Sequence, residues 1–365
     1  MSKSKSFSRD VITLTSVPLI SQFLGILLTP VLTRMYTPEA FGLAALLGSI
    51  VVIPAVFATM GYHSAIVLPK NNSLAKTVLL LCFCSIILIT GISFFTMIFV
   101  QEIIVSKLNT PSLINYLWLA PAFVFLHGTY MALRFWKTRF RHFSNLSAAR
   151  VSEVIGKKVY QISSGAVGFA SYGSLIYADL ITGILKCLVL IRGLNIGAIS
   201  FTRRTYLKVI AVAFRYKKFP QFNVWSELLN RLPAVVISIF FVKYFGSDAL
   251  GNYGLSLMVL SLPSALIVGS IIEAFVPRAA VAKHNNTHAE LLEKLYVPLV
   301  GIAIFPFMIL GIFSDRLFPV VFGPEWIQAG IISQILVIKI FFEVIFSPSL
   351  ALVDVINRQE LNFIR

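Results

Sequence analysis

The stretch Thr77–Val100, TVLLLCFCSIILITGISFFTMIFV, decides the fold class of this chain. It contains no Asp, Glu, Lys or Arg. As a helix rising about 1.5 Å per residue, it is long enough to cross about 30 Å of hydrocarbon. Val11–Thr33, Phe41–Tyr62 and Leu108–Leu133 are equally free of charge. Such segments must be helical, because lipid offers no partner to an unpaired backbone N–H or C=O group.

The overall composition agrees with membrane residence. Of the 365 residues, 57% are hydrophobic and 13% are charged, whereas a soluble domain carries about 25% charged residues. We therefore predict an all-α, polytopic membrane protein of about ten transmembrane helices. No small-residue cleavage site follows the first apolar run, so we expect that run to be a retained span. The predicted spans are 11–33, 41–63, 76–100, 112–133, 148–170, 172–191, 219–242, 251–275, 295–313 and 327–350.

The net charge of +16 is distributed unevenly over the predicted loops. With the N-terminus in the cytoplasm, Arg34, Lys107, Lys243 and Arg316 fall outside, and Arg231 and Lys339 fall within spans. All other Lys and Arg residues fall on the cytoplasmic side, which is the positive-inside bias of a multi-pass protein. Anionic headgroups of membrane lipids are the expected partners of these cations, and we expect no nucleic-acid partner.

An internal repeat relates the two ends of the chain. The turn Tyr36–Gly42 (YTPEAFG) and the turn Phe245–Gly251 (FGSDALG) share an acid, Ala, a bulky apolar residue and Gly at one offset. The first turn follows the first predicted span, and the second turn follows the seventh. The two copies therefore start an even number of spans apart, so the halves should run in the same orientation. We predict two parallel, pseudo-symmetric lobes around a central cleft. The predicted divisions are an N-terminal lobe at 1–192, a basic cytoplasmic linker at 193–218 and an incomplete C-terminal lobe at 219–365.

Ionisable residues within spans are the candidate functional residues, because each costs a few kcal/mol to insert. Glu227 and Arg231 in span seven are four residues apart, as are Lys339 and Glu343 in span ten, so each pair lies on one helical face. Each pair either neutralises itself for insertion or faces a shared polar cavity, and two pairs in one half favour the cavity. Further polar candidates for the lining are Asp179, Glu273, His63, Gln22 and Asn230.

The cations and the acids of this set suggest different ligands. Arg231, and second Lys339, are the candidates for binding a lipid phosphate or pyrophosphate. The carboxylates are candidates for binding a coupling proton or sodium ion. The sequence lacks a phosphate-binding Gly-rich loop ending in Lys-Ser/Thr, and Cys82, Cys84 and Cys187 form no metal-binding pattern. We therefore expect no enzymatic activity, no cofactor and no metal site.

Several motifs resemble one known family. Leu19–Gly25 (LISQFLG), Leu32–Gly42 (LTRMYTPEAFG), Tyr216–Pro220 (YKKFP) and Phe318–Trp326 (FPVVFGPEW) resemble the polysaccharide-repeat flippases. These are members of the multidrug/oligosaccharidyl-lipid/polysaccharide exporter superfamily. The family has twelve or more spans, so the chain is expected to be short at its C-terminal end.

The resemblance implies alternating access between two six-helix lobes in a bacterial cytoplasmic (inner) membrane. The implied substrate is an undecaprenyl-pyrophosphate-linked oligosaccharide, flipped outward during O-antigen, lipopolysaccharide or exopolysaccharide biosynthesis. A glycan polymerase and other assembly proteins are the implied protein partners. Three alternatives stay open: a cation-coupled drug exporter of the same superfamily, a membrane-bound polymerase or ligase, and a non-catalytic partner in a polysaccharide assembly complex.

Overall fold

The computed structural model describes residues 23–194, 203–284 and 288–355, and these contain helices and no strand. Seven helices are long and apolar enough to span a membrane. An eighth candidate is a bent pair, Pro111–Leu117 and Ala120–Arg139, whose two parts meet at 50°. The predicted all-helical membrane fold is thus confirmed.

Eight of the ten predicted spans coincide with these candidates, and the other two are the fifth and the first. The fifth predicted span corresponds to α7 (Phe143–Ala166), a 24-residue helix that is less apolar than these candidates because it carries Arg150, Glu153, Lys157 and Lys158. The first predicted span lies mostly outside the described residues, and only Phe23–Thr33, which includes α2 (Thr29–Thr33), is described there.

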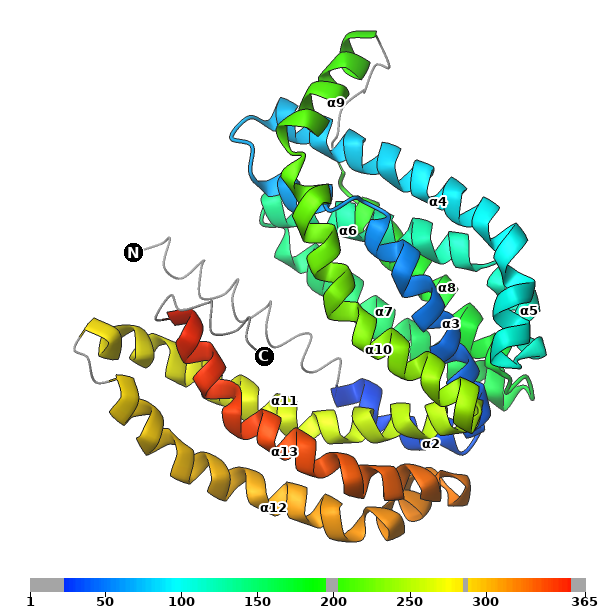
Figure 1. Ribbon diagram of the computed structural model, residues 1–365, viewed down its shortest axis with the longest axis vertical. Coiled ribbons are helices and arrows are strands. Elements are labelled where there is room, and N and C mark those ends of the chain that lie inside the picture. Colours follow the sequence, from blue (N-terminus) through cyan, green and yellow to red (C-terminus); the bar gives the residue numbers. More distant parts are fainter. Residues whose placement is uncertain (1–22, 195–202, 285–287, 356–365) are drawn as a thin grey trace. The chain divides into compact units, whose positions relative to one another are not determined.

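Contacts divide the chain into two compact units, Met1–Gly251 and Asn252–Arg365. The larger unit contains α2, α3 (Pro38–Phe57), η1 (Tyr62–Val67), α4 (Asn72–Leu108), η2 (Pro111–Leu113) and α5 (Ile114–Leu117). It continues with α6 (Ala120–Arg139), α7, α8 (Tyr172–Ile191), α9 (Arg203–Arg215), η3 (Phe219–Asn223) and α10 (Val224–Phe245). Figure 1 shows α6 beside α4 and α10 beside α3, and both pairs are in contact. The lobe boundaries predicted at 192 and 219 rest on the repeated turns, whereas the division at Gly251 rests on contacts. The lobes stay a prediction.

Local sequence explains where the helices of the larger unit begin and end. Thr37 caps α3, since its side chain accepts a hydrogen bond from the Ala40 N–H at 3.3 Å, and Pro38 occupies the first turn. Asn71 caps α4 by accepting from the Ser73 N–H at 2.8 Å. At the other end of α4, Asn109 adopts a left-handed conformation (φ 52°), which stops the helix after 37 residues.

The smaller unit is built from most of α11 (Ser247–His284), α12 (His288–Phe322), η4 (Pro324–Trp326) and α13 (Ile327–Val355). α12 packs along α13 through a core that includes Leu299, Phe307 and Val344. Ser256 of α11 donates a hydrogen bond to the Ala329 carbonyl of α13 at 2.6 Å, which ties the third helix to this pair.

The two repeated turns lie against each other within the larger unit. A Cβ atom at Gly42 would overlap the carbonyl oxygen of Ser247, and one at Gly251 would overlap the carbonyl oxygen of Pro38. Pro38 and Ser247 occupy the same place in their turns, as do the two glycines, so the contact is reciprocal. Reciprocal contact is what a two-fold axis between the turns produces. The two glycines, which lack a Cβ atom, allow the two helix backbones to approach this closely.

Candidate functional site

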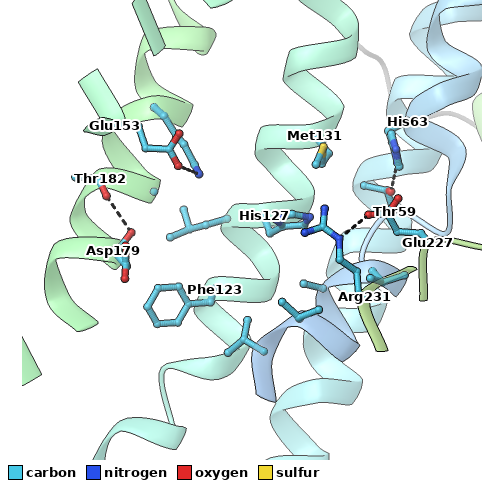
Figure 2. Close-up of a pocket in the computed structure, with 17 residues that line it drawn as sticks. Thr59, His63, Phe123, His127, Met131, Glu153, Asp179, Thr182, Glu227 and Arg231 are labelled. Carbon is cyan, nitrogen blue, oxygen red and sulfur yellow. Dashed lines mark hydrogen bonds and ion pairs between the residues drawn. The ribbon is translucent and has the colours of Figure 1, made fainter. Parts of the chain in front are cut away.

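A cavity of about 230 Å³ lies within the larger unit, between α3, α6, α8 and α10, with Glu153 reaching it from α7. Figure 2 shows the side chains that converge on it. Most of the lining from α3 and α6 is apolar, including Val52, Val56, Phe123 and Leu126. The polar lining residues are Thr59, His63, His127, Glu153, Asp179, Thr182, Lys186, Glu227 and Arg231.

The size of the cavity limits what it can hold. Sites for drug-sized ligands have volumes of about 300–1,000 Å³. A cavity of about 230 Å³ is therefore large enough for a phosphate headgroup or part of a sugar, and too small for a complete oligosaccharide. The lining combines apolar side chains with five Lys, Arg, Asp and Glu residues, so a charged group of this size would find both charge and apolar contact there.

α10 contributes Arg231, one of the two Lys or Arg residues of the lining. Arg231 and Glu227 lie one turn apart, and Arg231 Nε donates to Glu227 Oε1 at 3.1 Å. About half of each side chain is exposed, at 53% and 50%. Arg carries five N–H donors, and among the described residues neither Nη group of Arg231 has a hydrogen-bond acceptor. The guanidinium thus keeps its terminal donors available while Nε stays paired.

α7 and α8 hold a second set of charges, and these pair across helices. Lys186 of α8 lies 2.7 Å from Glu153 of α7, and its ammonium lies 4.5 Å from the centre of the Tyr130 ring. Asp179 of α8 forms an ion pair with Lys157 of α7. The Lys186–Glu153 side chains are only 16% and 25% exposed, so this pair is buried more deeply than the one on α10.

Two histidines complete the polar lining. Thr59 Oγ1 and His63 Nδ1 are 2.6 Å apart, and the tautomer of the ring decides which atom donates. The His63 ring also packs edge-on against Phe135, at 4.9 Å between ring centres. Figure 2 shows His127 projecting from α6 toward the Arg231 guanidinium. Imidazole groups here can donate or accept hydrogen bonds beside the permanent charges.

The cavity brings together four of the residues predicted from sequence: Arg231, Glu227, Asp179 and His63. Asn230 is exposed on α10 and is not part of the lining. Gln22 lies outside the described residues, and Glu273 lies in α11, where its side chain is not described. Lys339 and Glu343 pair with each other at 3.2 Å on α13 of the smaller unit.

Sequence reasoning missed the cavity roles of His127, Glu153 and Lys186. His127 is a single histidine in an uncharged segment, and it has no charged partner within a helical turn that would predict this place. Glu153 and Lys186 could not be paired from sequence, because a partner 33 residues away leaves no local pattern. Their one signal was their presence in otherwise apolar segments, which is costly without a partner.

The fold of this chain is similar to that of a solved transporter structure. A solved structure described as the inward-facing conformation of a multidrug resistance MATE family transporter of the MOP superfamily matches with a TM-score of 0.66. The match covers 96% of this chain and 85% of that one at 15% identity, so it shows the fold alone. The chain is a multi-pass membrane protein with the fold of a transporter.

Its family is also shown. Residues 31–331 match the family described as polysaccharide biosynthesis protein, and the chain belongs to that family. The teichuronic acid biosynthesis protein TuaB of Bacillus subtilis (strain 168) is 27% identical over 146 residues. These residues are 40% of this chain and 30% of that relative's length. The resemblance inferred from the sequence motifs is therefore confirmed at the level of family and fold.

Proposed function

We propose that this chain flips an oligosaccharide linked to undecaprenyl pyrophosphate from the cytoplasmic to the outer leaflet of a bacterial cytoplasmic membrane. The repeat unit would serve the synthesis of O-antigen or another surface polysaccharide. The protein would be multi-pass with a cytoplasmic N-terminus and no enzymatic activity of its own. Its family and its transporter fold both support this proposal.

The observation that carries the proposal is the guanidinium fork of Arg231, which points its terminal donors into a small charged cavity. A pyrophosphate carries its charge on oxygens that accept parallel N–H bonds, and Arg presents such donors as a planar pair. Glu227 holds the guanidinium through Nε without using those donors. The geometry therefore favours binding of the phosphate part of the substrate at Arg231.

The rest of the lining suits the sugar that follows the phosphate. Each hydroxyl moved bare into hydrocarbon costs a few kcal/mol, so a glycan needs acceptors and donors along its path. Asp179, Glu153 and Thr182 supply such groups on the side of the cavity formed by α7 and α8. The lipid tail can stay in the bilayer while the polar head crosses.

The same carboxylates offer a route for energy coupling. A proton or a sodium ion bound at Glu227 or Asp179 would change the net charge of the cavity between transport steps. Membrane lipids, a glycan polymerase and other assembly proteins are the proposed partners.

Gene replacement in the source bacterium tests the proposal. Cells without the gene should lose surface glycan and accumulate lipid-linked repeats inside. The wild-type chain should restore export, Arg231→Ala should not, and Arg231→Lys should restore it in part because it keeps charge and loses the fork. Lys243→Ala is the matched control, since it removes an exposed cation from the same helix outside the cavity. Loss of surface glycan without accumulation of lipid-linked repeats would contradict the proposal.

A second candidate is a cation-coupled exporter of organic cations. The cavity lining holds three carboxylates, Glu153, Asp179 and Glu227, against two permanent cations, Lys186 and Arg231. An excess of acids is what a site for cationic drugs requires. Unchanged surface glycan in the deletion strain, together with increased sensitivity to cationic drugs, would favour this function.

A further inference from the structure

α9 has more apolar surface than its packing uses. One face of the helix packs on the first turns of α4, where Val212 is buried in a core with Ala75 and Val78. Val209 and Ala213 lie beside Val212 against the same core. Figure 1 shows α9 next to this end of α4. These contacts fix the helix at the end of a candidate membrane span.

A second face is apolar and exposed. It consists of Tyr206, Leu207, Ile210 and Phe214, of which Phe214 is 71% exposed and Tyr206 is 67% exposed. At about 100° per residue these four side chains fall within an arc of about 100°. The three packing residues fall on a separate arc, so the exposed face is distinct from the packed one.

The third face is cationic. Lys208 and Arg215 lie on it, and Lys217 and Lys218 follow at the end of the helix, all of them exposed. Residues 193–218 contain no Asp or Glu, so no carboxylate of this segment neutralises them. A helix that is apolar on one side, cationic on another and docked at the end of a span has the composition of a helix in the plane of the membrane interface.

We propose that α9 lies in the interface of the cytoplasmic leaflet and binds the headgroups of anionic glycerophospholipids. The apolar face is buried at the boundary of headgroups and acyl chains, and the cations contact the phosphates. Anionic lipids are favoured over zwitterionic lipids, because the face beside the exposed apolar face carries Lys208 and Arg215 and no acid. The large exposed Leu, Ile and Phe side chains exclude a nucleic acid, whose phosphates would cover the cations and leave the apolar strip in water.

Lipid binding by the purified full-length chain tests the proposal. Fluorescent phosphatidylglycerol and phosphatidylcholine are titrated against the protein in neutral detergent. Because each cation near an anionic surface contributes about fivefold in affinity, Lys208→Gln with Arg215→Gln should weaken phosphatidylglycerol binding at least tenfold. Phosphatidylcholine binding should not change.

The matched control is Lys70→Gln with Arg141→Gln, which also removes two exposed cations from loops adjoining α4 and α6. It should retain the preference for phosphatidylglycerol within about twofold if the cations of α9 make the contacts with the anionic headgroups. An equal loss in both double variants would mean a general charge effect and overturn the proposal. Competition by inorganic phosphate would also overturn it, since that would reveal a site for a free anion.

Depth measurements test the apolar face independently. Nitroxide labels are placed through Phe214→Cys and Lys208→Cys in a chain without native cysteines, reconstituted in vesicles that contain phosphatidylglycerol. The label at 214 should be accessible to oxygen and protected from a water-soluble nickel complex, and the label at 208 should show the reverse. Free access of the nickel complex to position 214 would overturn the proposal. Low access of oxygen to position 214 would do the same, because a second copy or another part of the protein, and not lipid, would then cover this face.

Discussion

Two ion pairs of the same cavity, Lys186–Glu153 and Arg231–Glu227, are built in opposite ways. The first joins α8 to α7 over 33 residues of sequence, at 2.7 Å and with little exposure. The second lies within α10, one turn apart, at 3.1 Å and with about half of each side chain exposed. The first pair therefore fixes two helices, and the second positions a guanidinium that can still bind something else.

The difference follows from what each group loses when its partner is removed. A charge left alone in a poorly hydrated place costs several kcal/mol, whereas a half-exposed charge recovers most of its hydration. Stability should thus depend on the pair between α7 and α8, and transport on the pair within α10.

The largest expected effect is on stability at Lys186. Lys186→Ala leaves Glu153 with Arg150, which is 3.4 Å away and half exposed, so we expect a loss of about 2 kcal/mol in the free energy of unfolding. Unfolding in mixed micelles measures it, with the exposed Lys107→Ala as control. Adding Glu153→Gln should recover part of the loss, and strictly additive effects would show that the pair does not interact.

A smaller effect is expected when the pair on α10 is inverted. Glu227→Arg with Arg231→Glu keeps an ion pair four residues apart and should change the free energy of unfolding by less than about 0.5 kcal/mol. The guanidinium then lies about 6 Å nearer the N-terminal end of α10. Export of lipid-linked repeats should fall about tenfold, and full export would show that position along α10 is unimportant.

The smallest effect is expected at Lys339, whose side chain is 65% exposed beside Glu343. Lys339→Ala should lower the free energy of unfolding by no more than about 0.5 kcal/mol, as is usual for exposed pairs in one helix. If Lys339 also contacts substrate, export will fall while stability holds. That result would show that the ion pair of α13 in the smaller unit, like the pair of α10, acts in transport more than in stability.

The sequence predicted the fold from its long uncharged runs, because the cost of unpaired backbone groups in lipid leaves helices as the one solution for such chains. The helix predicted for the fifth span is present as α7 and packs on α8, where Glu153 and Lys157 find partners. The bend between Leu117 and Ala120 was missed, since an apolar run gives no sign of a break.

The site was predicted in part for a similar physical reason. Glu227 and Arg231 share one helix, so the helical period alone brings them together. Lys186 and Glu153 meet through the packing of two helices, and His127 projects toward Arg231 from a third. Periodicity within one segment contains no information on those distances.

The reciprocal contact of Gly42 and Gly251 with facing main chain limits which mutations can compensate for a larger residue at either position. In most close helix contacts, a side chain that becomes too large can be accommodated when its neighbour becomes smaller. Here the neighbour of each glycine is main chain, the Ser247 carbonyl for Gly42 and the Pro38 carbonyl for Gly251, and main chain cannot be trimmed by mutation. A genetic screen for suppressors of Gly42→Val should therefore return true revertants and distant changes, and none at the facing positions.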